Sequence, residues 1–218
     1  CLTGCADDPE ADGFYLHPNG ITVRCQDAVV GDVGVVDGMT YTKVSEIELD
    51  LESTSDSQEW GFFCTSGVRH MHSLFAGART FNQDISTWDT SSVTDMSSMF
   101  SGAREFNKDI GDWDTSSVTD MSVMFINTEV FNKNIGDWDT GNVNDMNYMF
   151  FNADSFNQDI GAWRTGSVNE MNYMFTWAES FNQDLGDWCV RLIQATPDEF
   201  DEEASSWTRS QPRWGTCP

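Results

Sequence analysis

The chain has 218 residues, in which 36 Asp and Glu outnumber 11 Lys and Arg and give a formal charge of −25. A surface this acidic repels phosphate, which argues against a nucleic-acid partner and against an anionic membrane surface. No apolar run reaches the roughly 18 residues that a membrane-spanning helix needs, so no membrane insertion is expected. The length suits one large domain or a row of small repeated units.

The cysteines form an even set of six, and none has the C-x-x-C spacing that is typical of zinc sites. We therefore expect disulfides, and with them a secreted protein or one on the extracellular surface, because disulfides persist in oxidising compartments. Their connectivity stays open at this stage. The six residues are Cys1, Cys5, Cys25, Cys64, Cys189 and Cys217.

The first region, residues 1–59, is predicted to form an N-terminal cap with a small β meander in residues 21–44. Within it, Asp37-Gly38 separates two alternating segments and is a strong signal for a tight hairpin. Ser45 and Glu48 have the spacing of a capping box, which predicts the start of a short helix.

The middle region, residues 60–190, repeats one motif at a step of 25 residues, as from Phe81 to Phe106. A fixed period of this size is typical of stacked repeat proteins. The repeated aromatic residues are Phe81, Phe106, Phe131, Phe156 and Phe181 together with Trp88, Trp113, Trp138, Trp163 and Trp188.

Each repeat divides into two halves. Val93, Met96 and Phe100 are spaced like one face of a helix, and the Ser92/Asp95 pair before them resembles a helix N-cap. The half that begins at Phe81 is too short for a helix and is predicted to be a short strand and turn. Stacking of like residues on like predicts an α/β repeat, a right-handed leucine-rich-repeat-like solenoid of short parallel strands and short helices.

The last region, residues 191–218, is predicted to be a C-terminal cap with a short acidic helix over 196–204, because Pro197 and Glu199 suit its first turn. Cys64 and Cys189 occupy the repeat position that holds Asp89 elsewhere. We expect Cys189 to pair with Cys217, and Cys64 to pair with one of the three cysteines before it.

The runs Trp-Asp-Thr-Ser-Ser-Val-Thr-Asp-Met-Ser-x-Met-Phe at 88–100 and 113–125, with weaker copies at 138–150 and 163–175, resemble the repeats of BspA-like bacterial surface proteins. The resemblance implies a leucine-rich-repeat-like solenoid exposed at a cell surface and used for adhesion or assembly, without catalytic residues. Some members are lipoproteins, so the resemblance makes Cys1 a candidate lipid anchor, whereas the even cysteine count favours a disulfide.

Two polar ladders follow from the period. The first ladder, which consists of Asp and Asn residues, could hold Ca²⁺, because stacked carboxylates repel one another and hard cations take oxygen ligands. The alternative is that each of these side chains hydrogen-bonds to the backbone of its own turn. The second, Thr90, Thr115, Thr140 and Thr165, could carry O-glycans or order water. No other cofactor is expected. The candidate calcium ladder is Asp84, Asp109, Asn134, Asp159 and Asp184.

Four aromatic residues break the repeat on its expected outer face: Tyr148, Phe151, Tyr173 and Trp177. They predict a contact surface for protein or glycan, unless the C-terminal cap folds back over them.

No catalytic constellation and no phosphate-binding loop is legible, so an enzyme is not expected. The sequence favours a non-enzymatic extracellular or cell-surface repeat protein that mediates adhesion or binds protein or glycan. The alternative is a structural subunit of an extracellular filament or coat, in which the partners are copies of the same chain.

Overall fold

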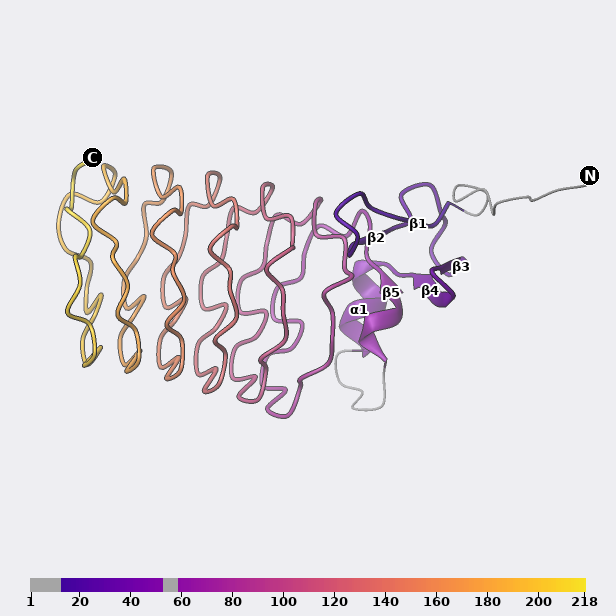
Figure 1. The fold of residues 1–218 in the computed structure, drawn as a ribbon, viewed down its shortest axis with the longest axis horizontal. Coiled ribbons are helices and arrows are strands. Elements are labelled where there is room, and N and C mark those ends of the chain that lie inside the picture. The colour runs from indigo at the N-terminus through magenta and orange to yellow at the C-terminus, as the bar shows by residue number, and fades with distance from the viewer. Residues whose placement is uncertain (1–12, 53–58) are drawn as a thin grey trace, which may run out of the picture.

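In a computed structural model, which describes residues 13–52 and 59–218, the chain forms a row of stacked coils with a small folded region at its N-terminal end (Figure 1). All the named elements of the described residues lie in that region and at its junction with the first coil. They are β1 (Tyr15–Leu16), β2 (Val23–Arg24), β3 (Val33–Val36), β4 (Met39–Lys43), α1 (Glu46–Glu52), the 3-10 helix η1 (Trp60–Phe62) and β5 (Phe63–Cys64).

Backbone hydrogen bonds join each coil to the next. Alternate N–H groups of one coil donate to carbonyl oxygens 24 residues later, as from Ser98 to Ser122 at 2.9 Å. The residues between them close local turns instead, as where Met99 N–H donates to the Met96 carbonyl at 3.2 Å. Every repeat therefore uses its backbone partly within its own coil and partly on its neighbour.

The helix that we predicted in each repeat is wrong. Ser98 and Gly102 have φ angles of 57° and 71°, which place them in the left-handed region and interrupt any helical run. A positive φ at the third residue is the mark of a type II turn, and the apolar residues recur every three or four positions because successive turns follow one another. The spacing of the apolar residues therefore predicted the buried face correctly but the backbone conformation wrongly.

The short strand predicted from Phe81 is also absent. The parallel pairing between coils is limited to isolated bridges at another position of the repeat. These bridges connect His70, Asp95, Asp120, Asp145 and Glu170 in one line. The described residues thus form a repeat fold with few short strands and almost no helix.

Identical side chains stack inside the coils. Val93, Met96 and Phe100 are fully buried. The rings of Phe100 and Phe125 lie 5.6 Å apart and 10° from parallel, and the rings of Trp88 and Trp113 lie 6.4 Å apart and 4° from parallel. Because each large ring rests on the same ring of the next coil, burial and offset stacking both favour the in-register stack.

Buried polar atoms satisfy carbonyl oxygens of adjacent coils. The indole N–H of Trp138 donates to the Ile110 carbonyl at 3.0 Å, and the hydroxyl of Thr140 donates to the Arg164 carbonyl at 3.2 Å. The threonine ladder is buried, so our expectation that it carries O-glycans or orders surface water is wrong. Its members are Thr65, Thr90, Thr115, Thr140 and Thr165.

In the N-terminal region the hairpin prediction is confirmed. β3 and β4 pair antiparallel around Asp37 and Gly38, whose φ angles of 51° and 78° suit a tight hairpin turn. The capping box is confirmed as well, since Glu48 accepts the Ser45 N–H at 2.7 Å at the start of α1. The single meander over 21–44 is not formed, because β2 pairs with β1 in a separate two-stranded sheet.

The acidic helix predicted over 196–204 is wrong, because this segment adds a further coil. The N–H groups of Tyr173, Phe175 and Trp177 donate to carbonyls of the segment, each at 2.8 Å. Phe200 and Trp214 repeat Phe175 and Trp188 at a step of 25 or 26 residues, a signal that the sequence already contained.

Two disulfides fasten the ends of the stack, and both predicted pairings are confirmed. Cys25 bonds to Cys64 and joins the N-terminal region to the first coil. Cys189 bonds to Cys217 and ties down the last segment. The predictions for Cys1 and Cys5 lie outside the described residues.

The Thr140→Val substitution tests the buried ladder. Valine keeps the volume but leaves the Arg164 carbonyl without its donor, and we expect the free energy of unfolding to fall by about 1–3 kcal/mol. Chemical denaturation measures it. The half-exposed Thr94, whose hydroxyl bonds the Arg69 carbonyl at 3.3 Å, provides the control, because in Thr94→Val that carbonyl still accepts the backbone N–H of residue 94 at 2.8 Å. Equal losses for both variants would contradict the ladder's role.

Candidate functional site

The candidate calcium ladder consists of turn acceptors. Asp84 Oδ1 accepts the Ser86 N–H at 3.0 Å, and Asn134 Oδ1 accepts the Gly136 N–H at 3.0 Å in the same way. The equivalent bonds recur at Asp109, Asp159 and Asp184. Within residues 13–52 and 59–218, no group of three or more His, Cys, Asp or Glu is placed to hold a metal ion. The local-turn interpretation therefore accounts for these residues.

A second column, which sequence reasoning missed, runs beside this ladder. Asn82 Oδ1 accepts the Asn107 N–H at 3.0 Å, and Asn107 Oδ1 accepts the Asn132 N–H at 3.1 Å. The column continues to Asn182, which accepts the Thr208 N–H at 2.9 Å. The signal was the asparagine that follows each repeated phenylalanine, and its role is to connect coils.

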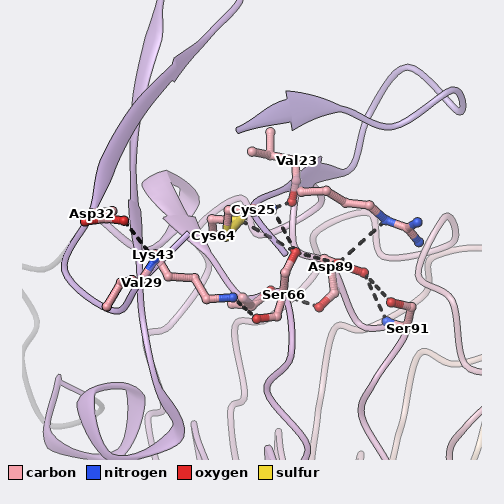
Figure 2. The surroundings of a disulfide bond; sticks show 11 residues. Val23, Cys25, Val29, Asp32, Lys43, Cys64, Ser66, Asp89 and Ser91 are labelled. Carbon is pink, nitrogen blue, oxygen red and sulfur yellow. Dashed lines mark hydrogen bonds and ion pairs between the residues drawn. A yellow bond between two sulfur atoms is a disulfide. The ribbon is translucent and has the colours of Figure 1, made fainter. Parts of the chain in front are cut away.

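A buried polar cluster surrounds the Cys25–Cys64 disulfide (Figure 2). Ser66 donates to Asp89 Oδ2 at 2.6 Å, and Arg24 Nε lies 3.6 Å from the same oxygen. Lys43 is buried and donates to the Ser66 carbonyl; its burial lowers the pKa of the amine, while Asp89 acts in the opposite direction. Figure 2 shows Lys43, Ser66 and Asp89 side by side near the disulfide, so the cluster attaches the N-terminal region to the stack.

A line of acidic residues marks the bridged position of the repeat. Asp145 bridges to Asp120 on one side and Glu170 on the other, and its Oδ1 accepts the Asn147 N–H at 2.8 Å. Burial raises the pKa of Asp145, and the two neighbouring acids raise it further. This line stores like-charge repulsion at neutral pH.

The Asp145→Asn substitution tests that repulsion. A carboxyl whose pKa is higher in the folded state binds more protons there than in the unfolded state, so its contribution to stability falls as pH rises through the folded pKa. We expect Asp145→Asn to raise the free energy of unfolding at pH 7 by about 0.5 kcal/mol. Because both states are protonated below the ordinary value of 3.8, the difference disappears there.

Denaturant titrations at several pH values provide the measurement. The control is Asp112→Asn at an exposed position, which we expect to change stability by only a few tenths of a kcal/mol. A destabilised Asp145→Asn at pH 7 would contradict the repulsion.

The structure brings the four predicted aromatic residues together, and we call Tyr148, Phe151, Tyr173 and Trp177 the aromatic stripe. The ring centres of Tyr148 and Tyr173 lie 4.6 Å apart and the two rings are 5° from parallel, while the ring centres of Phe151 and Trp177 lie 5.2 Å apart. Trp177 is 47% exposed, and the other three side chains are partly exposed. The stripe therefore forms one connected surface across neighbouring coils.

The backbone under the stripe is in a conformation that bulky residues disfavour. Tyr148, Tyr173 and Trp177 have φ angles of 57°, 60° and 58°. At the equivalent turn positions other coils use Ser98 and Asn152, which fit this region with less strain, although one coil has Val123 there with φ 62°. The fold thus accepts small polar residues here, and the aromatic side chains need an explanation beyond folding.

The C-terminal segment does not cover the stripe, which excludes the alternative that a folded-back cap buries it. The next coil places Glu199 and Glu203 at the turn positions that follow Tyr173 and Trp177. Phe200 turns inward, with its ring 5.4 Å from Phe175 in the core.

The family model described as "Mycoplasma protein of unknown function, DUF285" matches residues 43–135 and 108–214, so the two matches together span most of the chain. No curated protein and no solved structure matches this chain. None of the helices in the described part of the chain is long and apolar enough to cross a membrane.

Proposed function

Since the chain belongs to the DUF285 family, we propose that it is a non-enzymatic repeat protein of the extracellular or cell surface that adheres to a protein partner through the aromatic stripe. The BspA-like repeat motif supports a surface location, and the two disulfides support an oxidising compartment. Within this proposal the coil stack is a right-handed, leucine-rich-repeat-like solenoid.

The observation that carries the proposal is the strained and exposed aromatic surface. Tyr and Trp supply large contact areas at the centres of protein interfaces. Tyr148, Tyr173 and Trp177 hold positive φ angles where Ser98 and Asn152 serve in other coils, and a contact function would account for these large rings at such positions. A row of rings on successive coils also suits an extended protein surface better than a small molecule.

Acidic residues at one end of the stripe define the chemistry of the partner. Glu199 raises the pKa of the Tyr173 hydroxyl, with smaller contributions that include Glu202 and Asp198. An aromatic surface in a negative field favours cations, which can lie over ring faces and pair with carboxylates. We therefore expect a partner whose contact surface combines apolar groups with Lys or Arg.

Binding is tested with the double variant Tyr148→Ser, Trp177→Asn, which introduces the residues of Ser98 and Asn152 and should preserve the fold. A panel of purified extracellular proteins, both basic and acidic, is screened by surface plasmon resonance. We expect a basic protein to bind the natural chain and to lose at least about tenfold in affinity with the variant.

The control is Val130→Ser, which removes another exposed apolar side chain (42% exposed) and adopts the residue of Ser155. The protein-partner proposal would be overturned if the double variant bound the protein as tightly as the natural chain does. It would also be overturned if the natural chain bound glycans on a parallel array but none of the proteins.

A structural subunit of a filament is the second candidate, because the last coil leaves backbone donors open. In the described residues, the N–H groups of Glu199, Asp201 and Glu203 have no hydrogen-bond partner. Such an edge can template another coil, but charged side chains along it discourage the pairing. The acidic edge thus favours a monomer at neutral pH.

The triple variant Glu199→Asn, Asp201→Asn, Glu203→Asn removes the charge and keeps residues that tolerate positive φ. We expect sedimentation velocity to show a monomeric natural chain and a self-associating variant. The control, Asp112→Asn, Asp137→Asn, Asp187→Asn, removes the same charge from exposed positions elsewhere. Filaments formed by the natural chain would instead support the structural-subunit function.

A further inference from the structure

A second candidate site lies where the β3–β4 hairpin meets the first coils. A cavity of about 470 Å³ opens there, with apolar lining from Met39, Tyr41 and Phe62. The rings of Tyr41 and Phe62 approach edge to face at 6.1 Å. Met39 and Phe62 remain 53% and 38% exposed, so part of this apolar lining is open to solvent.

Phe62 is an exception within the repeat. Its position is held by small or polar residues in the later coils, such as Thr87 and Ala162, one and four repeats later. The stack therefore does not require an aromatic side chain at this position. Among these equivalent positions, an aromatic residue occurs only in the coil that faces the hairpin, where Phe62 borders the cavity.

Polar groups line the cavity beside this apolar surface. Asp84 and Asn82 each use one side-chain oxygen, Oδ1, for a coil-forming hydrogen bond. The remaining Asp84 Oδ2, the Asn82 amide NH₂ and the Lys108 ammonium have no hydrogen-bond or ion-pair partner within the described ranges. The lining thus offers hydrogen-bond donors and an acceptor next to exposed ring surface.

We propose that this cavity binds one residue of a neutral saccharide. A sugar ring has an apolar C–H face that packs on aromatic carbon, and its hydroxyl groups both donate and accept hydrogen bonds. Phe62 and Met39 take the apolar face, while Asp84, Asn82 and Lys108 bond the hydroxyls. The same chemistry is offered by a free oligosaccharide and by the terminal residue of a glycoprotein.

The charges of the lining disfavour other ligand classes. An anion would meet Asp84, Glu59 and the net charge of −25, while the Lys108 ammonium offsets part of the attraction that these carboxylates exert on a cation. A hydroxylated neutral ring can satisfy both signs of charge at once. This site is separate from the aromatic stripe, so the proposal stands independently of the protein partner.

The test uses variants that copy residues of other coils. Phe62→Ala introduces the residue of Ala162, and Asp84→Asn introduces that of Asn134, whose Oδ1 still accepts the turn N–H. The natural chain is screened on an array of neutral and acidic glycans, and the hits are titrated calorimetrically as free oligosaccharides and as glycoproteins.

We expect a neutral saccharide to bind and each variant to weaken binding by at least about tenfold while melting temperatures stay unchanged. The stripe variant Tyr148→Ser, Trp177→Asn is the matched control and should bind the saccharide normally. Retention of no neutral saccharide, or binding that both Phe62→Ala and Asp84→Asn leave intact, would overturn the proposal. Loss of binding in the stripe variant alone would assign the sugar to the stripe and likewise overturn it.

Discussion

The backbone hydrogen bond between one coil and the next is the constraint on which the remaining structure depends. When alternate N–H groups donate to carbonyls 24 residues later, each coil must repeat the path of its neighbour. Like side chains then lie on like, as the nearly parallel stack of Trp88 and Trp113 shows. Trp138 and Thr140 complete the scheme by donating side-chain hydrogen bonds to the Ile110 and Arg164 carbonyls of adjacent coils.

This constraint explains which parts of the structure the sequence could predict. The period, the buried face and the two disulfides follow from residue identity at a fixed step. The turns could not be predicted, because apolar residues at i, i+3 and i+4 are as typical of a helix as they are of consecutive turns. Only the φ angles of Ser98 and Gly102 separate the two, and serine gives no signal for a positive φ. The last coil was missed because one extra residue precedes Trp207 and shifts the step from 25 to 26.

The candidate sites were predictable to different degrees. The aromatic stripe was predictable because Tyr148 and Tyr173 share the 25-residue register, which places one ring on the other, and Phe151 and Trp177 follow them within four residues. The cavity beside Phe62 was not, since it depends on contact with Tyr41 of the hairpin, which no local pattern specifies. The stripe and Phe62 of the cavity depart from the repeat. In a fold where every position has a stacking role, departures that the stack does not need are the best indicators of binding.

Amide hydrogen exchange measured residue by residue by NMR tests the central claim, that bonds between coils hold the stack and end at the last coil. We predict strong protection for the donors Ser98, Val123 and Tyr148, whose N–H groups bond the next coil. The N–H groups of Glu199, Asp201 and Glu203 should exchange rapidly in the same sample, because no further coil accepts them. Rapid exchange at Ser98, Val123 and Tyr148, or protection of the last three groups in the monomer, would contradict the account.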